Sequence, residues 1–311
     1  MQWWGPVSMN FLKPFRFILL ALFGVILAGQ SLALTLDDGP NLDTTPKLTG
    51  DERNRRLLEA FREKGIRVAL FANGIRGGDT PEGVRWLQAW GKAGHRIGNH
   101  TYSHLNLEEV GLVKFKEDLI RLDKVIRDIP GYWPMLRFPF LLEGKGVVEW
   151  KAVQAILKEQ GYSPAPVSVP TYDWLFNARL HTLLEARPDA DIAPLKALYL
   201  QHLVRILKGH RDLARKLLGK DPVYTILLHH NLLNALVMPD ILRMLEANGW
   251  KVVSPEEAYK DPIYQEDLSM VGYSESHLGA MARKLGVLLE DVRLLEAQFA
   301  MQSANIKEYI H

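Results

Sequence analysis

The 311-residue chain contains no cysteine and no marked excess of either charge, and its apolar run near the N-terminus is short for a membrane span. The absence of cysteine excludes a disulfide framework and a thiolate site, although it does not fix the redox compartment. Because 38 lysines and arginines oppose 36 aspartates and glutamates without forming a basic stripe, a nucleic-acid partner has little support. The length suits one large α/β domain or two small ones.

The N-terminus carries a short hydrophobic segment. Phe17–Ala28 is an apolar run that follows Lys13 and Arg16 and precedes Ser31-Leu32-Ala33, which offers small residues at a cleavage site. This pattern is typical of a secretory signal, whereas a membrane span needs about 20 apolar residues. We therefore expect residues 1–33 to be a cleaved signal peptide and the protein to be periplasmic or secreted. Retention of the segment as a membrane anchor is the alternative.

Strand-like apolar runs alternate with helical patterns six or seven times along the rest of the chain. Ile66–Ala72 follows a helical pattern over residues 51–64, and Val223–Leu228 suits a strand that is buried on both faces. This alternation predicts βα units around a parallel sheet, either a barrel or an open sheet. Residues 177–219 are helical and basic, and Leu278–Lys307 has amphipathic helical spacing.

Candidate polar side chains directly follow several of the predicted strands. They are Asp37, His100, Arg137, Asp173 and His229. The carboxyl ends of parallel strands lie at one face of the sheet, where α/β folds place their active sites. We therefore expect these five side chains to meet at one site.

Two short motifs supply a pair of carboxylates and a pair of imidazoles. Asp37-Asp38-Gly39-Pro40 ends the first predicted strand, and His100 and His104 lie one turn apart if their segment is helical. One aspartate and two histidines make three ligands for a divalent cation, and the other aspartate remains free to act on a water molecule. A tight turn and a chance pair of surface histidines are the structural alternatives. Together the motifs predict metal-assisted hydrolysis.

Three further positions carry candidate chemistry. Arg137 lies among apolar residues and needs an anionic partner if it is buried; a surface arginine is the alternative. Trp174, next to Asp173, suits either the core or a pocket wall for a sugar face or an acetyl methyl group. His229 could be a general acid, because the ordinary pKa of an imidazole is about 6.5, but a lone histidine at a strand end is often structural, and the adjacent His230 leaves open which imidazole faces the pocket. Three histidines fall in the helical segment 177–219, and we expect them to be surface or packing residues: His181, His202 and His210.

These motifs, in this order, resemble those of the polysaccharide deacetylases, which are metal-dependent N- and O-deacetylases of carbohydrates. The resemblance extends from Leu34 to Pro255 and implies a distorted (β/α)7-type barrel with parallel strands. It assigns roles to eight residues: general base Asp37 with its partner Arg137, metal ligands Asp38, His100 and His104, general acid His229 tuned by Asp173, and acetyl-pocket residue Trp174. Pro139 and Phe140, which follow Arg137, are further expected substrate-binding residues. One divalent cation is implied, with zinc first and cobalt, nickel or iron as alternatives. The family commonly has an aspartate after the last histidine, where this chain has His230-Asn231.

We therefore expect an exported, metal-dependent deacetylase of an N-acetylated glycan. Residues 34–261 would form the catalytic domain and residues 262–311 a C-terminal helical extension that caps the barrel or recruits a partner. A glycan is the expected partner, and membrane contact would be transient and limited to the signal segment. The alternatives are a related C–N hydrolase of a small non-peptide amide and a glycan-binding relative without turnover.

Overall fold

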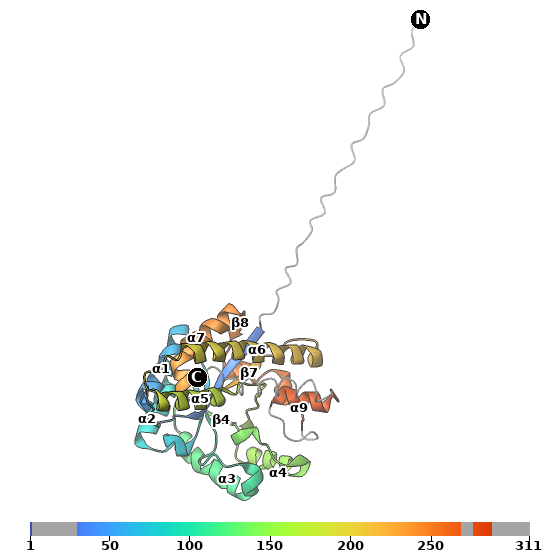
Figure 1. Ribbon diagram of the computed structural model, residues 1–311. Coiled ribbons are helices and arrows are strands. Elements are labelled where there is room, and N and C mark those ends of the chain that lie inside the picture. The colour runs from blue at the N-terminus through green and yellow to red at the C-terminus, as the bar shows by residue number, and fades with distance from the viewer. Residues whose placement is uncertain (2–29, 269–275, 288–311) are drawn as a thin grey trace.

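The computed structural model describes residues 30–268 and 276–287, together with Met1 (Figure 1). Most of the predicted signal segment and most of the predicted helix Leu278–Lys307 lie outside these residues. Within the described ranges, no helix is both long and apolar enough to cross a membrane.

The strands form a single parallel sheet in the order β5-β4-β3-β2-β1-β7-β6, and β8 also pairs with β1. They are β1 (Gln30–Gly39), β2 (Ala69–Ala72), β3 (Arg96–Asn99), β4 (Tyr132–Leu136), β5 (Ser163–Pro164), β6 (Val169–Pro170), β7 (Tyr224–His229) and β8 (Trp250–Val252). In the part of the chain that the structure describes, the outer strands β5 and β6 are not paired, so the barrel is open between them. The predicted distorted barrel with parallel strands is confirmed.

Helices connect the strands and surround the sheet (Figure 1). They are α1 (Gly50–Lys64), α2 (Pro81–Lys92), α3 (Leu107–Ile126), α4 (Gly146–Glu159), α5 (Asp173–Ala186), α6 (Ala193–Leu218), α7 (Leu232–Ala247), α8 (Pro255–Ala258) and α9 (His277–Lys284). Local signals explain their ends: Thr49 and Glu52 form a capping box at the start of α1, and Gly65 ends this helix with a φ of 63°. The predicted helical segment 177–219 falls in α5 and α6, which pack against each other and against α7.

The long strand β1 lies at the centre of the sheet and of the core. Its leucines Leu32, Leu34 and Leu36 are fully buried, as expected for a parallel strand covered on both faces. The strand begins at Gln30, and the buried Ala33 is paired with β7. A boundary between residues 33 and 34 would therefore divide the central strand.

The described part of the C-terminal extension packs on the barrel. The backbone N–H of His277 donates to the carbonyl of Val167, and α9 contacts α6. Helix α9 ends at Lys284 because Gly286 adopts a left-handed φ of 67°. The prediction of one continuous helix from residue 278 is therefore wrong at this point, and its remainder from residue 288 lies outside the described residues.

Candidate metal and catalytic site

The end of β1 directs two adjacent aspartates to different partners. Asp37 still belongs to the ladder between β1 and β7 and is buried, whereas Asp38 has a φ of 63° that turns the chain. The Asp37 carboxylate consequently pairs with Arg137, and the Asp38 carboxylate faces His100 and His104. A carboxylate that can hold a cation thus lies beside one that can accept a proton.

Asp38, His100 and His104 form a cluster with the properties of a metal site. Their donor atoms all lie within 4.8 Å of one another, and Asp38 Oδ1 lies 3.9 Å from His100 Nε2 and 3.8 Å from His104 Nε2. Asp38 Oδ1 is buried and accepts no hydrogen bond from any described residue. Burial and the nearby His100 lower the pKa of His104 to about 4, which keeps this imidazole neutral and able to ligate. An orphaned carboxylate oxygen facing two imidazole nitrogens fits a divalent cation.

The imidazole of His100 is oriented by the backbone of Arg137. Its Nδ1 lies 2.7 Å from the Arg137 carbonyl oxygen, which can only accept, so Nδ1 carries the proton. Nε2 is thereby left facing the two carboxylates, 3.9 Å from Asp38 Oδ1 and 3.7 Å from Asp37 Oδ2. Metal-ligating histidines generally donate their other N–H to a carbonyl or carboxylate in this way, which fixes the ring and the tautomer.

The two histidines lie in a loop, so the helical turn suggested by their spacing is not formed. Thr101 and His104 have φ values of 59° and 53°, which no helix allows. The backbone N–H of Ser103 donates to the carboxylate of Asp118 at 2.7 Å and ties the loop to helix α3. The expectation of a helical turn over residues 100–104 is therefore wrong, but the loop still brings His100 and His104 together, with ring centroids 4.9 Å apart.

Arg137 is buried and forms the expected pair with Asp37. Its Nη1 donates to the two carboxylate oxygens at 3.1 and 3.3 Å, and only 1% of the residue is exposed. The other guanidinium nitrogens donate to Thr35 Oγ1, to the Tyr259 hydroxyl and to the Ala165 carbonyl. This set of acceptors fixes the arginine, which in turn orients the Asp37 carboxylate. Thr35 and Tyr259 carry no motif that would have revealed their part in the site.

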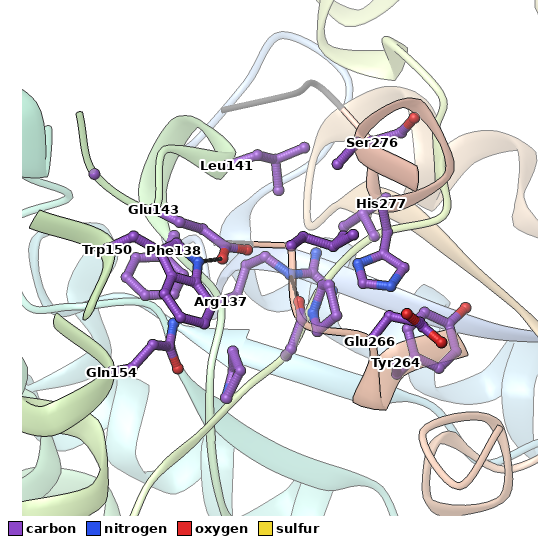
Figure 2. Close-up of a pocket in the computed structure, with 17 residues that line it drawn as sticks. Arg137, Phe138, Leu141, Glu143, Trp150, Gln154, Tyr264, Glu266, Ser276 and His277 are labelled. Atoms are coloured by element: carbon purple, nitrogen blue, oxygen red, sulfur yellow. Dashed lines mark hydrogen bonds between the residues drawn. The ribbon is translucent and has the colours of Figure 1, made fainter. Parts of the chain in front are cut away.

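A small cavity of about 90 Å³ lies beside Arg137 (Figure 2). The indole N–H of Trp150 donates to the Glu143 carboxylate at 3.2 Å along one wall of this cavity (Figure 2). Of the predicted site residues, Arg137 alone lines it, so this cavity is distinct from the one that contains the metal ligands.

His229 forms the expected pair with Asp173, which occupies the first position of α5. His229 Nδ1 lies 2.7 Å from Asp173 Oδ1, and the His229 backbone N–H donates to Asp173 Oδ2 at 2.8 Å. Burial by itself would lower the pKa of His229, but the charge and hydrogen bond of Asp173 outweigh burial and raise the pKa to about 9. The imidazole therefore retains a proton at neutral pH, as a general acid requires.

The choice between His229 and His230 is decided by burial. His229 lines the large cavity, whereas His230 is fully buried and its Nε2 bonds to Asn54 Oδ1 at 3.0 Å on the opposite side of the strand end. Burial lowers the pKa of His230 to about 3, so this imidazole is neutral. His230 is a core residue, and His229 is the candidate acid.

One cavity of about 480 Å³ is lined by Asp37, Asp38, His100, His104 and His229, whereas Arg137 and Asp173 do not line it and reach it through Asp37 and His229. Its walls include Trp174, which is 52% exposed, and Phe140, which is 55% exposed and has its ring 4.6 Å from that of His104. Pro139 is buried and does not line the cavity, so it is not a contact residue here. Four wall residues had no sequence signal: Leu141, Pro170, Tyr172 and Leu227.

The chain is similar to carbohydrate deacetylases over its first half. A family model for polysaccharide deacetylase matches residues 26–163. The peptidoglycan-N-acetylglucosamine deacetylase of Bacillus cereus is 31% identical over 146 residues, which make up 46% of each chain. The chitin deacetylase of Colletotrichum lindemuthianum is 28% identical over 182 residues, or 55% of this chain and 66% of that protein. This chain therefore spans between about half and two thirds of these relatives' lengths.

Solved structures support the fold. The structure of the chitin deacetylase from Colletotrichum lindemuthianum superposes with a TM-score of 0.54 at 21% identity, covering 74% of this chain and 87% of that one. A CE4 family pseudoenzyme from Bacillus anthracis superposes with a TM-score of 0.51 at 17% identity, covering 74% of this chain and 66% of that one. Since the same fold occurs with and without activity, the fold alone does not establish a reaction, and the residues in the pocket determine the chemistry.

Proposed function

We propose that this protein belongs to the polysaccharide deacetylase family, whose model matches residues 26–163, and that it is a metal-dependent hydrolase that removes acetyl groups from N-acetylated glycan. One observation carries the proposal: the donor atoms of Asp38, His100 and His104 converge in the cavity that also contains Asp37 and His229. A pocket that retained only glycan binding would not need a paired carboxylate base and a protonated imidazole beside a cation site.

Asp38, His100 and His104 would hold one divalent cation. When bound there, the cation would polarise the acetyl carbonyl and lower the pKa of a water molecule. Two imidazoles and a carboxylate with space for further ligands suit zinc first, and cobalt, nickel or iron also accept such donors.

Asp37 and His229 would move the two protons of the reaction. Asp37, held in place by Arg137, accepts the proton of the water that attacks the acetyl carbon. His229 donates its proton to the sugar nitrogen as the C–N bond breaks, which releases acetate and a free amino sugar. Trp174 and Phe140 offer apolar faces at the mouth of the cavity, where the rings of a glycan would stack.

Acetate release would test the proposal directly. The full chain, stripped of metal and then supplied with Zn²⁺ or Co²⁺, should release acetate from at least one of three substrates: chitooligosaccharide, peptidoglycan fragments or exopolysaccharide. The metal-free sample is the matched control. Absence of release from every glycan would refute the proposal. Release from a small amide alone would indicate the related C–N hydrolase, and metal binding without any turnover would indicate a glycan-binding relative.

We also propose that the protein is exported, on the strength of the charged, apolar and small-residue pattern of residues 13–33. Because β1 starts at Gln30, a cut after Ala33 would remove four residues from the central strand. We therefore expect cleavage upstream of Gln30 or retention of the segment as an anchor. Cell fractionation with N-terminal sequencing of the purified protein checks this, and a cytoplasmic protein with an intact N-terminus would contradict it.

The pH dependence of acetate release should depend on Asp173. In the wild type, loss of activity at alkaline pH should follow deprotonation of His229, whose pKa is raised to about 9. Asp173→Asn removes the negative charge that raises the pKa of His229, whereas the effect of burial, which lowers this pKa, remains. The pKa of His229 should therefore fall, and the alkaline limb of the kcat/KM profile should move to lower pH. We expect activity at neutral pH to fall on the order of 10²-fold.

The control for this experiment is Asp221→Asn, which removes a carboxylate that pairs with Arg215 before β7 begins. Its pH profile should match that of the wild type. An unchanged alkaline limb in Asp173→Asn would show that His229 is not the group that titrates there.

A further inference from the structure

The carboxylate of Asp173 is fully buried and receives hydrogen bonds on both oxygens. Oδ1 accepts from His229 Nδ1, and Oδ2 accepts from the side-chain amides of Asn231 at 2.9 Å and Asn234 at 2.6 Å. A buried carboxylate with both oxygens engaged has one allowed orientation. Its orientation in turn sets the direction of the His229 imidazole.

The amide of Asn234 is itself fixed by three partners. Its Nδ2 donates to Asp173 Oδ2 and to the His229 carbonyl at 2.8 Å, and its Oδ1 accepts from the Tyr199 hydroxyl at 2.8 Å. The reversed amide would direct its oxygen at two acceptors, which is unfavourable. The two acceptors therefore fix the orientation of the amide, and the Tyr199 hydroxyl donates to the oxygen and holds Asn234 in the place from which it donates to Asp173.

Tyr199 belongs to helix α6, which contributes no residue to the large cavity. It is fully buried, and burial raises the pKa of its hydroxyl well above the usual value, so the hydroxyl remains a donor throughout the working range. Almost one turn further along α6, His202 Nε2 bonds to the Thr171 carbonyl at 2.7 Å. Helix α6 thus bonds directly to the segment before Asp173 through His202, and it reaches Asp173 indirectly through the bond of Tyr199 to Asn234.

Asn231 provides a second support from the start of helix α7. Its Oδ1 accepts from the Asn234 backbone N–H as the N-cap, while its Nδ2 donates to Asp173. An aspartate here could cap the helix but could not donate, and it would bring a second carboxylate against Asp173. The two asparagines therefore form one donor set matched to a single carboxylate.

We propose that Tyr199 and Asn234 are positioning residues that hold the Asp173 carboxylate and, through it, the His229 imidazole in the direction required for proton donation. The helical segment that contains α6 would accordingly act on the pocket without touching substrate. The consequence for turnover rests on the proposed deacetylase function, whereas the effect on the imidazole does not.

The test compares Tyr199→Phe and Asn234→Asp with the wild type in the full-length chain. With selectively ¹⁵N-labelled histidine, the hydrogen-bonded Nδ1–H signal of His229 is assigned from its absence in His229→Gln. We expect this proton to exchange faster with solvent in both variants. We also expect kcat for acetate release to fall about tenfold in Tyr199→Phe and on the order of 10²-fold in Asn234→Asp, with KM and metal content unchanged.

Tyr224→Phe is the matched control because it removes another buried tyrosine hydroxyl, one that bonds to Asp221 and has no link to Asp173. It should keep the wild-type signal and kcat. Wild-type exchange and wild-type kcat in folded Tyr199→Phe would overturn the proposal, and this variant decides the question even if Asn234→Asp does not fold. If the wild type releases no acetate from any glycan, the deacetylase function fails, and the exchange measurement alone still decides whether the network holds His229.

Discussion

Replacing Asp38 with asparagine should abolish measurable metal binding and lower acetate release by at least about 10³-fold. Asp38 is the one anionic member of the donor cluster, and its buried Oδ1 has no other partner among the described residues. Asparagine preserves the size of the side chain but removes the charge that offsets the charge of the cation. Metal content by atomic spectroscopy and acetate release on the same sample measure the two effects together.

Asp212→Asn is the control for this change, because it alters an exposed aspartate on α6 that pairs with Lys208. It should bind metal and release acetate like the wild type. Stoichiometric metal and full activity in Asp38→Asn would contradict the assigned ligand set. Loss of metal with full activity would contradict the metal-dependent reaction itself.

The site residues could be found from the sequence because the fold is parallel. Asp37 and His229 are far apart along the chain, but each ends a buried strand, and the structure pairs them directly in the β1–β7 ladder. Arg137 follows β4 and Asp173 follows β6, so the same argument brings them to the same face. The alternation of strand and helix was therefore sufficient to predict which motifs meet.

Local geometry and supporting contacts could not be found in this way. The loop of His100 and His104 depends on positive φ values at two residues that usually avoid them, for which spacing gives no signal. Tyr259 and Asn234 act through single hydrogen bonds made by tertiary packing. The choice of His229 over His230 likewise required knowing which imidazole the core covers.

Replacing Arg137 with methionine should destabilise the metal-free protein by about 3–5 kcal/mol. The arginine is 1% exposed and Asp37 is 2% exposed, so the substitution leaves a carboxylate buried with neither counter-charge nor its main donor. The loss of stability should arise mostly from the unpaired buried carboxylate of Asp37, because methionine fills a volume similar to that of arginine. Urea denaturation of wild type and variant in the presence of chelator measures the change in the free energy of unfolding.

The double variant Asp37→Asn with Arg137→Met distinguishes two contributions to stability: the unpaired charge of Asp37 and the other hydrogen bonds of the arginine. If the charge dominates, removing both members should recover most of the loss, and the coupling in the double-mutant cycle should be well above about 1 kcal/mol. If Arg137→Met is equally destabilising with asparagine at position 37, the cause is instead the loss of the bonds to Thr35, Ala165 and Tyr259. That result would make Arg137 chiefly a clamp between β1, β4 and the segment before β6.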